Sequence, residues 1–484
     1  MPPQKYVNLD YAASTPMRPE AIKAQQAYDS SPLAGVNPNS LHSLGRQAAI
    51  KLEDCRRTIA HSLGARVRSS EIIFTGGGTE ANVLALLGIP DAVRQRWRTR
   101  TRVIVSAIEH DSILDNIASL RASGFEVDLV KPDRAGRILP DALAAVMGDD
   151  VALVSVMMAN NETGVVQPIG ELARVAHAHG ARIHVDAIQG WLHTPFDVNE
   201  LGVDALSIAG HKIGGPVGIG ALYLKTRTTI RARSFGGGQE VGLRPGTQDL
   251  RAIIALSAAT SALLPNVRTD AVRVGMMANK LYAALCEHPR IHATMGDWST
   301  IDRLPGIVSI YVEGMDSEEL ILQLDGRGFE VSAGSACSSG SLDASHVLLA
   351  MGVPREDALG SLRISFDDRV DERDLDRFAR AVWEVWDRCS SVNFFRTYSI
   401  GSHVRTPKLG ITLVFPSEIP MQRWRGSSAH SMPRSTRFFV PLSWELMSYS
   451  RITLCTFPLP IASRPPRPCA QARPPRCTRR RVMA

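Results

Sequence analysis

Between residues 70 and 225, short apolar runs rich in β-branched residues alternate with longer stretches of helical character. This alternation is typical of βα units around a mainly parallel sheet. The runs predict strands at Glu71–Thr75, Arg102–Ser106, Ala152–Met158, Arg182–Asp186, Ala205–Ala209 and Gly220–Leu224. Ligands of open α/β sheets bind beyond the carboxyl ends of the strands. The residues that directly follow these strands are therefore the first candidates for a functional site.

The pattern changes after about residue 255. A long helical stretch, Leu256–Glu287, precedes strand-like runs at Ile307–Val312 and Gly328–Ser332, and helical stretches follow near residues 343–352 and 370–388. Elements that no longer alternate in βα order are typical of an α+β arrangement. We therefore predict a large α/β domain followed by a smaller α+β domain.

Composition sets the end of the chain apart. Residues 391–484 hold 15 of the 55 Lys and Arg, only two of the 48 Asp and Glu, and 12 of the 29 prolines. The residues before them, with 40 basic and 46 acidic side chains, are mildly acidic. Segments of such Arg/Pro-rich composition rarely bury enough apolar surface to fold, so we predict that this tail is disordered.

The remaining composition argues against several classes of protein. Neither end has a secretory pattern and no run approaches the roughly 18 to 20 apolar residues that span a bilayer, so we expect a cytoplasmic protein without membrane segments. The seven cysteines lack paired spacing, which argues against a disulfide framework and a zinc site, and we expect no metal. With 44% apolar and 21% charged residues, the chain is otherwise typical of a soluble globular protein.

Three glycines, Gly76, Gly77 and Gly78, follow the first predicted strand and lead through Thr79 into a helical stretch. Free backbone amides at a helix N-terminus, with a threonine hydroxyl beside them, form a good phosphate cradle. The segment is neither a Walker A nor a GxGxxG motif, and a simple tight turn is an equally good interpretation.

Two other predicted strands deliver charged residues at their carboxyl ends. Asp186 ends one, and Lys212 follows another among small residues. Alone, Asp186 is more typical of a helix cap and Lys212 of a solvated charge. Together they are the pair that pyridoxal-phosphate chemistry needs, a lysine that forms an imine with the coenzyme and an acid that keeps its pyridine nitrogen protonated. We therefore predict pyridoxal phosphate as the cofactor.

Ordered motifs extend over about four fifths of the chain, from Tyr6 to Cys389. They include Leu9-Asp10-Tyr11-Ala12-Ala13-Ser14-Thr15-Pro16, Asn37-Pro38-Asn39-Ser40-Leu41-His42, Glu109-His110, Asn160-Asn161-Glu162-Thr163-Gly164, Arg244-Pro245-Gly246-Thr247 and Ser332-Ala333-Gly334-Ser335-Ala336-Cys337. In these motifs the chain resembles the cysteine desulfurases of the NifS/IscS type, in the class V aminotransferase branch of fold-type-I pyridoxal-phosphate enzymes. The resemblance implies an α/β, fold-type-I transferase fold with a mainly parallel large-domain sheet and a smaller α+β C-terminal domain. We expect an N-terminal segment that packs with the small domain, a coenzyme-binding domain, a small domain with the catalytic cysteine loop, and the tail, at residues 1–20, 21–255, 256–390 and 391–484.

The resemblance also implies roles for individual residues. Pyridoxal phosphate would be held by Gly78, Thr79 and His211 at the phosphate, Thr247 at the phosphate of the other subunit of a homodimer, Asp186 at the pyridinium nitrogen, Gln189 at the phenolic oxygen, and Lys212 as the covalent link. His110 would stack on the ring and transfer protons, and Asn161 and Arg363 would bind the substrate. Without the resemblance, His110 is equally typical of a buried core histidine and Arg363 of a surface ion pair.

Cys337 selects the reaction within this family. It lies in Gly334-Ser335-Ala336-Cys337-Ser338-Ser339-Gly340-Ser341, whose side chains offer little bulk for a core, so a buried structural thiol fits poorly. A loop that carries a thiolate to the substrate sulfur fits well. We predict that Cys337 accepts sulfur from L-cysteine as a persulfide, leaves L-alanine, and passes the sulfur to an acceptor such as an iron-sulfur scaffold or a transfer-RNA thiolation partner.

The chain departs from the family pattern at several points. Ala209 stands where the family has a phosphate-binding serine, Val241 where an arginine is common, and Gly214-Gly215-Pro216-Val217 where an aromatic or His usually precedes Gly-Pro-Lys. The tail has no family counterpart. It fits a nucleic-acid-binding arm or the product of a shifted reading frame in a GC-rich gene, and we favour the second.

Two other functions stay open. A selenocysteine lyase or another class V lyase would keep Lys212, Asp186 and His110, and turnover of cysteine against selenocysteine separates these activities. A basic-tailed module that binds nucleic acid or a scaffold protein would have lost catalysis, and the intact pair of Lys212 and Cys337 argues against it.

Overall fold

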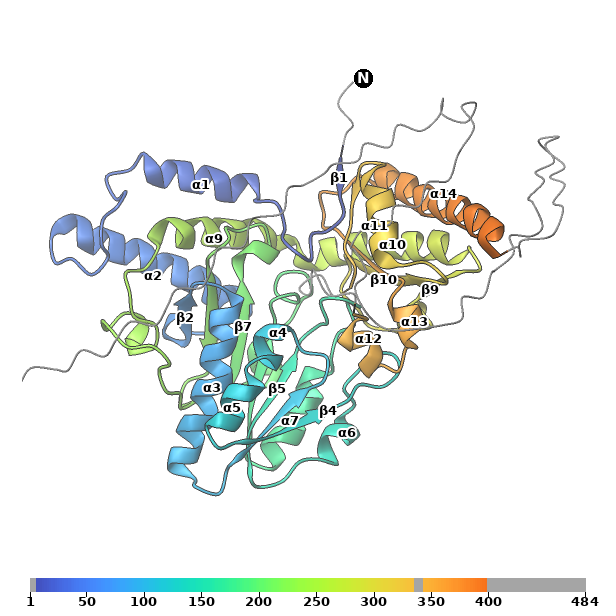
Figure 1. Cartoon of the computed structure of the whole chain (residues 1–484). Coiled ribbons are helices and arrows are strands. Elements are labelled where there is room, and N and C mark those ends of the chain that lie inside the picture. Colours follow the sequence, from blue (N-terminus) through green and yellow to red (C-terminus); the bar gives the residue numbers. More distant parts are fainter. Residues whose placement is uncertain (1–5, 335–342, 398–484) are drawn as a thin grey trace, which may run out of the picture. The chain divides into compact units, whose positions relative to one another are not determined.

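A mainly parallel sheet forms the centre of the large domain (Figure 1). The computed structural model describes residues 6–334 and 343–397, and within them the sheet has the order β2-β8-β7-β6-β5-β3-β4. Its strands are β2 Ile72–Thr75, β3 Arg102–Ser106, β4 Glu126–Val130, β5 Val151–Met157, β6 Arg182–Asp186, β7 Ala205–Ala209 and β8 Gly220–Leu224. The pairs from β7 to β4 are parallel, whereas β8 runs antiparallel to both β2 and β7. The prediction of a mainly parallel sheet is confirmed, and β4 is the one strand of this sheet that the apolar pattern missed.

Helices cover both faces of this sheet because alternate side chains of each strand point to opposite faces. In β3, Val103 and Val105 pack in the same cluster as residues of α3 (Gly78–Arg96), whereas Ile104 belongs to the cluster that contains α7 (Ile169–Ala178). All residues of β5 are buried, as expected for a central parallel strand. The other helices before residue 264 are α1 Pro19–Asp29, α2 Ser43–Leu63, α4 Asp111–Leu114, α5 Ile117–Ala122, α6 Pro140–Ala144, α8 Val198–Leu201 and α9 Leu250–Leu263.

The long helical stretch predicted at Leu256–Glu287 is two helices, α9 and α10 (Val267–Cys286). Pro265 lies in the short 3₁₀ turn between them, where its missing N–H and its ring interrupt a continuous α-helix. Within the described residues, Leu250–Cys286 is the one stretch long and apolar enough by composition to cross a bilayer, and 56% of its most apolar window is buried inside the fold. α9 packs against α1 and α2, and α10 packs against β10 and α14 (Glu372–Thr397), so both are core helices.

The small domain contains an antiparallel sheet of β9 Ile291–Ala293, β10 Ile307–Val312 and β12 Ser361–Ser365. Its further helices are α11 Ser317–Asp325, α12 His346–Ala350 and α13 Arg355–Ala358, together with α14, which continues beyond residue 390 to Thr397. The strand predicted at Gly328–Ser332 is only the two-residue β11, Phe329–Glu330, which pairs in parallel with β1, Val7–Asn8.

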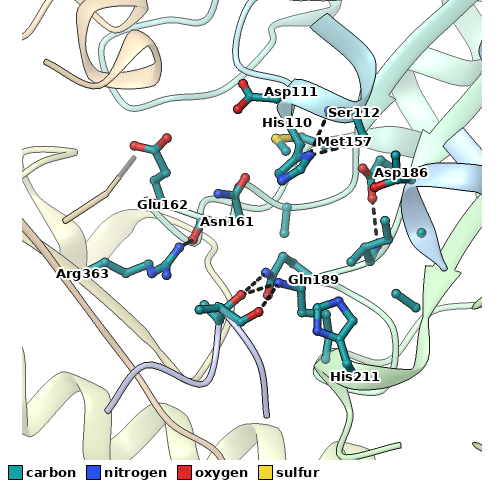
Figure 2. A pocket seen from close by; sticks show the side chains of 18 of the residues that line it. His110, Asp111, Ser112, Met157, Asn161, Glu162, Asp186, Gln189, His211 and Arg363 are labelled. Atoms are coloured by element: carbon teal, nitrogen blue, oxygen red, sulfur yellow. Dashed lines mark hydrogen bonds between the residues drawn. The ribbon is translucent and has the colours of Figure 1, made fainter. Parts of the chain in front are cut away.

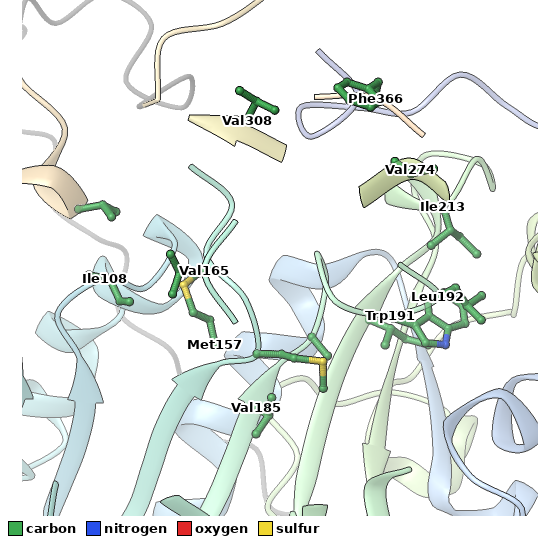
Figure 3. Packing of buried hydrophobic residues seen from close by; sticks show 14 of the residues in the cluster. Ile108, Met157, Val165, Val185, Trp191, Leu192, Ile213, Val274, Val308 and Phe366 are labelled. Carbon is green, nitrogen blue, oxygen red and sulfur yellow. The ribbon is translucent and has the colours of Figure 1, made fainter. Parts of the chain in front are cut away.

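One hydrophobic cluster extends through both domains. It contains Val185 of β6 and Trp191 from the large domain, and Val308 of β10 and Phe366 from the small domain (Figure 3). Trp191 is completely buried, and its Nε1 donates to Ser62 Oγ at 3.0 Å. Protein interiors are packed without large voids. This shared core therefore holds the two domains firmly against each other.

Candidate active site

A cavity of about 320 Å³ lies at the carboxyl ends of β5, β6 and β7. This volume falls within the range of small-molecule sites. Sequence-predicted residues that line it are Gly78, Thr79, His110, Asn161, Asp186, Gln189, His211, Lys212 and Arg363. Figure 2 shows His110, Asn161, Asp186, Gln189 and Arg363 arranged around the same space. Thr247 is exposed and does not line the cavity, and Cys337 lies outside the described residues, although Gly334 is part of the cavity wall.

Asp186 is a buried carboxylate at the end of β6, with 5% of its surface exposed. Burial raises its pKa, and hydrogen bonds from Ile188 N at 2.9 Å and Asn82 Nδ2 at 2.7 Å act in the opposite direction. A buried carboxylate held in this way is stabilised further by any cationic N–H that enters the cavity.

Asn82 joins Asp186 to His110. Its amide Nδ2 also donates to Ser112 Oγ at 2.9 Å, and that hydroxyl lies 3.0 Å from His110 Nδ1. His110 caps α4, and its Nδ1 accepts from the backbone N–H of Ser112 at 3.0 Å. Since a backbone amide can only donate, the neutral imidazole carries its hydrogen on Nε2.

A second carboxyl group lies close to Asp186. Glu109 is fully buried, and its Oε1 accepts from Met157 N at 2.7 Å and from Ser106 Oγ. Burial raises the pKa of Glu109 to about 8, with a smaller contribution from the charge of Asp186. At neutral pH the Glu109 carboxyl is therefore mostly protonated.

Lys212 follows β7 in the short turn Gly210–Lys212 and is half-buried. Its Nζ donates to the carbonyl oxygens of Ala12 at 2.6 Å and Ala13 at 3.0 Å, and Gln189 Nε2 donates to the same Ala12 oxygen at 3.0 Å. The N-terminal segment thus forms one wall of the cavity and holds the lysine ammonium beside the amide of Gln189.

The predicted phosphate cradle lies at the N-terminus of α3. Gly77 is the N-cap residue with φ of +151°, a conformation open to glycine, and α3 begins at Gly78. His211 adjoins this end, and burial lowers its pKa to about 4, with smaller contributions from the charges of Lys212 and His110. A neutral His211 can donate one hydrogen bond to an anion, whereas Ala209, which also lines the cavity, offers no side-chain donor.

The opposite wall carries Arg363 of β12. Arg363 is 2% exposed, its Nη1 donates to Asn161 O at 3.0 Å, and its Nη2 pairs with Asp10 Oδ1 at 2.8 Å. Glu162 is buried beside it, accepts from Ser345 Oγ, and has a pKa raised by burial. A guanidinium in such a wall is suited to a carboxylate ligand.

Sequence reasoning gave no role to several residues that shape this cavity. Asn82, Ser112 and Asp10 contact predicted site residues, and Glu162 and His346 also line the cavity. Asp10, Asn82 and Glu162 stand in or next to the motifs quoted above. Their position in a motif was the only signal in the sequence, and it did not indicate what each side chain does.

Comparison with known proteins places this site in a family. The sequence model described as aminotransferase class-V matches residues 7–378. The chain belongs to the class-V aminotransferases. Within this family, the cysteine desulfurase IscS of Dictyoglomus turgidum is 37% identical over 393 residues, which cover 81% of this chain and 98% of the relative. The resemblance to cysteine desulfurases of the NifS/IscS type is confirmed.

Two solved structures at about 30% identity share the fold. A NifS-like protein matches with a TM-score of 0.71 and 31% identity, over 79% of this chain and 100% of the other. A structure described as SspA in complex with cysteine matches with a TM-score of 0.65 and 30% identity, over 75% of this chain and 99% of the other. The predicted fold-type-I architecture is confirmed.

The residues of the cavity fit the coenzyme of this family. Asp186 offers a buried carboxyl whose ionised form a cationic N–H would stabilise, and the N-terminus of α3 offers backbone amides beside the neutral His211. Lys212, Asp186 and the Gly78–Thr79 turn all line the one cavity. These residues therefore suit a flat ring that carries a protonated nitrogen at one end and an anionic group at the other.

Proposed function

We propose that this cavity is the active site of a pyridoxal-phosphate-dependent cysteine desulfurase, which converts L-cysteine to L-alanine and leaves the sulfur on Cys337. The observation that carries the proposal is that Lys212, Asp186, His110 and Arg363 line a single cavity whose wall also contains Gly334. The family and its desulfurase relatives support the same chemistry.

The coenzyme would be held by residues already placed around the cavity. Lys212 would bind it covalently, Asp186 would face its ring nitrogen, and Gln189 its phenolic oxygen. The amides at the start of α3, Thr79 and His211 would hold the phosphate. Thr247, which is exposed in the single chain, would complete the phosphate site of a second subunit in a homodimer.

The bound coenzyme supplies an electron sink that stabilises negative charge at the substrate α-carbon. Lys212 Nζ is the group that takes up the α-hydrogen and later returns a proton. His110 would stack on the coenzyme ring and offer an N–H at Nε2, because its Nδ1 is occupied by the Ser112 amide. Arg363 and Asn161 orient the substrate through its carboxylate.

Sulfur transfer then requires a thiolate. Cys337 Sγ attacks the substrate sulfur, the carbon-sulfur bond breaks, and its electron pair stays with the carbon skeleton, which is protonated to L-alanine. The sulfur remains on Cys337 as a persulfide, and we propose that an iron-sulfur scaffold or a transfer-RNA thiolation partner takes it up. Incubation of the persulfide form, labelled with ³⁵S, with purified candidates of both kinds identifies the acceptor.

Two substitutions test the proposed function. The purified protein should release L-alanine from L-cysteine, and Cys337→Ala should retain the visible absorbance of the coenzyme but form no persulfide. Lys212→Ala should lose the absorbance of the lysine-bound coenzyme. Both results follow if the thiol and the amine perform separate steps.

Cys286→Ala is the matched control, because Cys286 is a half-buried thiol at the end of α10 whose pKa burial raises. It should form alanine at the rate of the unsubstituted protein. A Cys337→Ala protein that still accumulates persulfide, or an unsubstituted protein that releases no alanine from cysteine, contradicts the proposal.

A further inference from the structure

The N-terminal segment, residues 6–18, contacts both sides of the cavity. Leu9 N donates to Glu330 O, and Ser365 N donates to Leu9 O, which ties the segment to the small domain. A few residues further on, the carbonyl of Ala12 accepts from Lys212 Nζ at 2.6 Å. The segment thus joins β12, which carries Arg363, to the wall that holds the lysine.

Asp10 of this segment reaches the substrate side of the cavity through its contact with Arg363. Its Oδ1 pairs with Arg363 Nη2 at 2.8 Å, and its Oδ2 accepts from Ser332 Oγ at 2.7 Å. Ser332 and Arg363 are already paired through their backbones, with Arg363 N donating to Ser332 O at 2.8 Å. Asp10 therefore binds the side chains of Ser332 and Arg363, two residues that already lie side by side through their backbone hydrogen bond.

This arrangement determines how the guanidinium is presented. Arg363 is 2% exposed, and Asp10 is its one acidic ion-pair partner among the described residues. Asn161 O accepts from Nη1 of Arg363, and Asp10 Oδ1 accepts from Nη2. These two acceptors fix the plane of the guanidinium group. Each Nη retains a second hydrogen, and a long side chain that is held in this way loses little further freedom when a carboxylate arrives.

We infer that Asp10 is a positioning residue for the substrate carboxylate, acting through Arg363. The inference rests on the proposed function, in which Arg363 binds that carboxylate. Asp10 sets the orientation of the guanidinium and balances its charge before the substrate enters. Without Asp10, Arg363 keeps its charge and loses the partner that aims it.

A double-mutant cycle tests this inference by binding. L-alanine is titrated into the coenzyme-loaded protein, and its Kd is read from the change in visible absorbance. Asp10→Ala and Arg363→Ala should each raise the Kd at least about tenfold, and the double variant should lie within about twofold of Arg363→Ala, because the two residues act on one contact. Asp10→Asn, which preserves size and one acceptor, should fall between the unsubstituted protein and Asp10→Ala.

Asp29→Asn is the matched control, since Asp29 pairs with Arg251 at 2.7 Å on the surface and does not line the cavity. It should bind L-alanine as the unsubstituted protein does. An unchanged Kd in both Asp10 variants overturns the inference, as does an Asp10→Ala effect of the same size in the Arg363→Ala background. So does an unsubstituted protein whose spectrum does not respond to L-alanine.

The binding assay separates this inference from the proposed function. A protein that binds L-alanine but releases none from cysteine has a different activity, and its cycle still measures whether Asp10 acts through Arg363. A protein that desulfurates cysteine but shows no coupling between the two residues retains its function and has no such role for Asp10.

Discussion

The amide of Asn82 donates to the carboxylate of Asp186 at 2.7 Å, and both groups are buried. Asn82 comes from α3, the helix that begins at the predicted phosphate cradle, whereas Asp186 ends β6. One helix thus contributes its N-terminus to the cavity wall and, one turn later, a side chain that binds Asp186.

Asn82→Ala should make Asp186 harder to ionise. A hydrogen bond to a charged acceptor contributes about 1.5–3 kcal/mol, so its loss should move the acidic limb of the pH–activity profile upward by about one to two pH units. The sign follows because burial already raises the pKa of Asp186 and the Asn82 bond opposes that effect. Alanine release measured between pH 5 and 9 gives the profile.

Asn199→Ala is the control for this shift, because Asn199 Nδ2 donates to Asp197 at 3.1 Å in α8, outside the cavity lining. Its profile should match that of the unsubstituted protein. An Asn82→Ala profile with an unmoved acidic limb would show that Asn82 does not stabilise the Asp186 carboxylate.

Gly220→Ala should weaken binding of pyridoxal phosphate. A Cβ at this position of β8 would lie 2.6 Å from Ile208 O and 2.7 Å from the carbonyl carbon of Gly77, so backbone would have to move. Because Gly77 caps α3 at the proposed phosphate site, we expect the Kd for the coenzyme, read by visible absorbance, to rise at least about tenfold, equivalent to about 1.4 kcal/mol.

Gly170→Ala provides the contrast. Nothing lies within 4 Å of a Cβ at this position in α7, and Gly in a helix costs roughly 0.5–1 kcal/mol relative to Ala. The variant should bind the coenzyme normally and unfold at a higher denaturant concentration. If Gly220→Ala also binds the coenzyme normally, the turn at Gly77 does not depend on close packing with β8.

The sequence predicts the sheet and the two charged strand ends well because both leave local signals. Apolar runs mark β5, β6 and β7, and Asp186 and Lys212 stand where such runs stop. β4 was missed because Glu126 and Asp128 interrupt its apolar residues at the edge of the sheet. Pro265 was visible in the sequence, but the apolar residues on either side of it favoured one continuous helix.

Contacts between distant segments leave no such local signal. Asp10 and Arg363 are 353 positions apart, and each alone is an ordinary surface-type charge. Asn82 follows the glycine turn at the start of α3, but its amide gives no chemical signal of its own, and only the fold brings it to Asp186. The roles of all the site residues stay predictions. Thr247 is also exposed in the single chain, and Cys337 lies outside the described residues.

Val241→Asn should stabilise the protein. Val241 has φ of +52° and 76% of its surface exposed, and the left-handed region costs a non-glycine residue about 1–2 kcal/mol. The turn keeps this conformation because the preceding Glu240 is bound by Arg56 at 2.6 Å and by Gln248 at 3.0 Å. Asn adopts this region more readily, so we expect the free energy of unfolding to rise by about 1 kcal/mol in denaturant titrations.

A midpoint that is unchanged or lower in Val241→Asn would mean that the exposed valine side chain forms contacts in the assembled protein. Measuring the midpoint at several protein concentrations distinguishes that case, because contacts between subunits make it concentration-dependent.

His184→Gln should reduce the acid sensitivity of folding. His184 is completely buried in β6, with Nδ1 3.0 Å from Ser155 Oγ and Nε2 2.9 Å from Ser207 Oγ, so it joins three neighbouring strands. Burial lowers its pKa to about 3, against about 6.5 in an unfolded chain. Between these values the unfolded state binds the extra proton, so this part of the stability is complete above about pH 6.5 and declines as the pH falls toward 3.

Glutamine can hydrogen-bond to both serines and does not titrate in this range. In the variant, the difference in bound protons between the unfolded and folded states should therefore be smaller by up to one proton. The slope of unfolding free energy against pH, measured in denaturant between pH 6.5 and 4, should fall by up to about 1.4 kcal/mol per pH unit. Other histidines whose pKa burial lowers, such as His193 and His211, leave a residual slope. A His184→Gln slope equal to that of the unsubstituted protein would mean that His184 takes up its proton in the folded state as readily as in the unfolded chain.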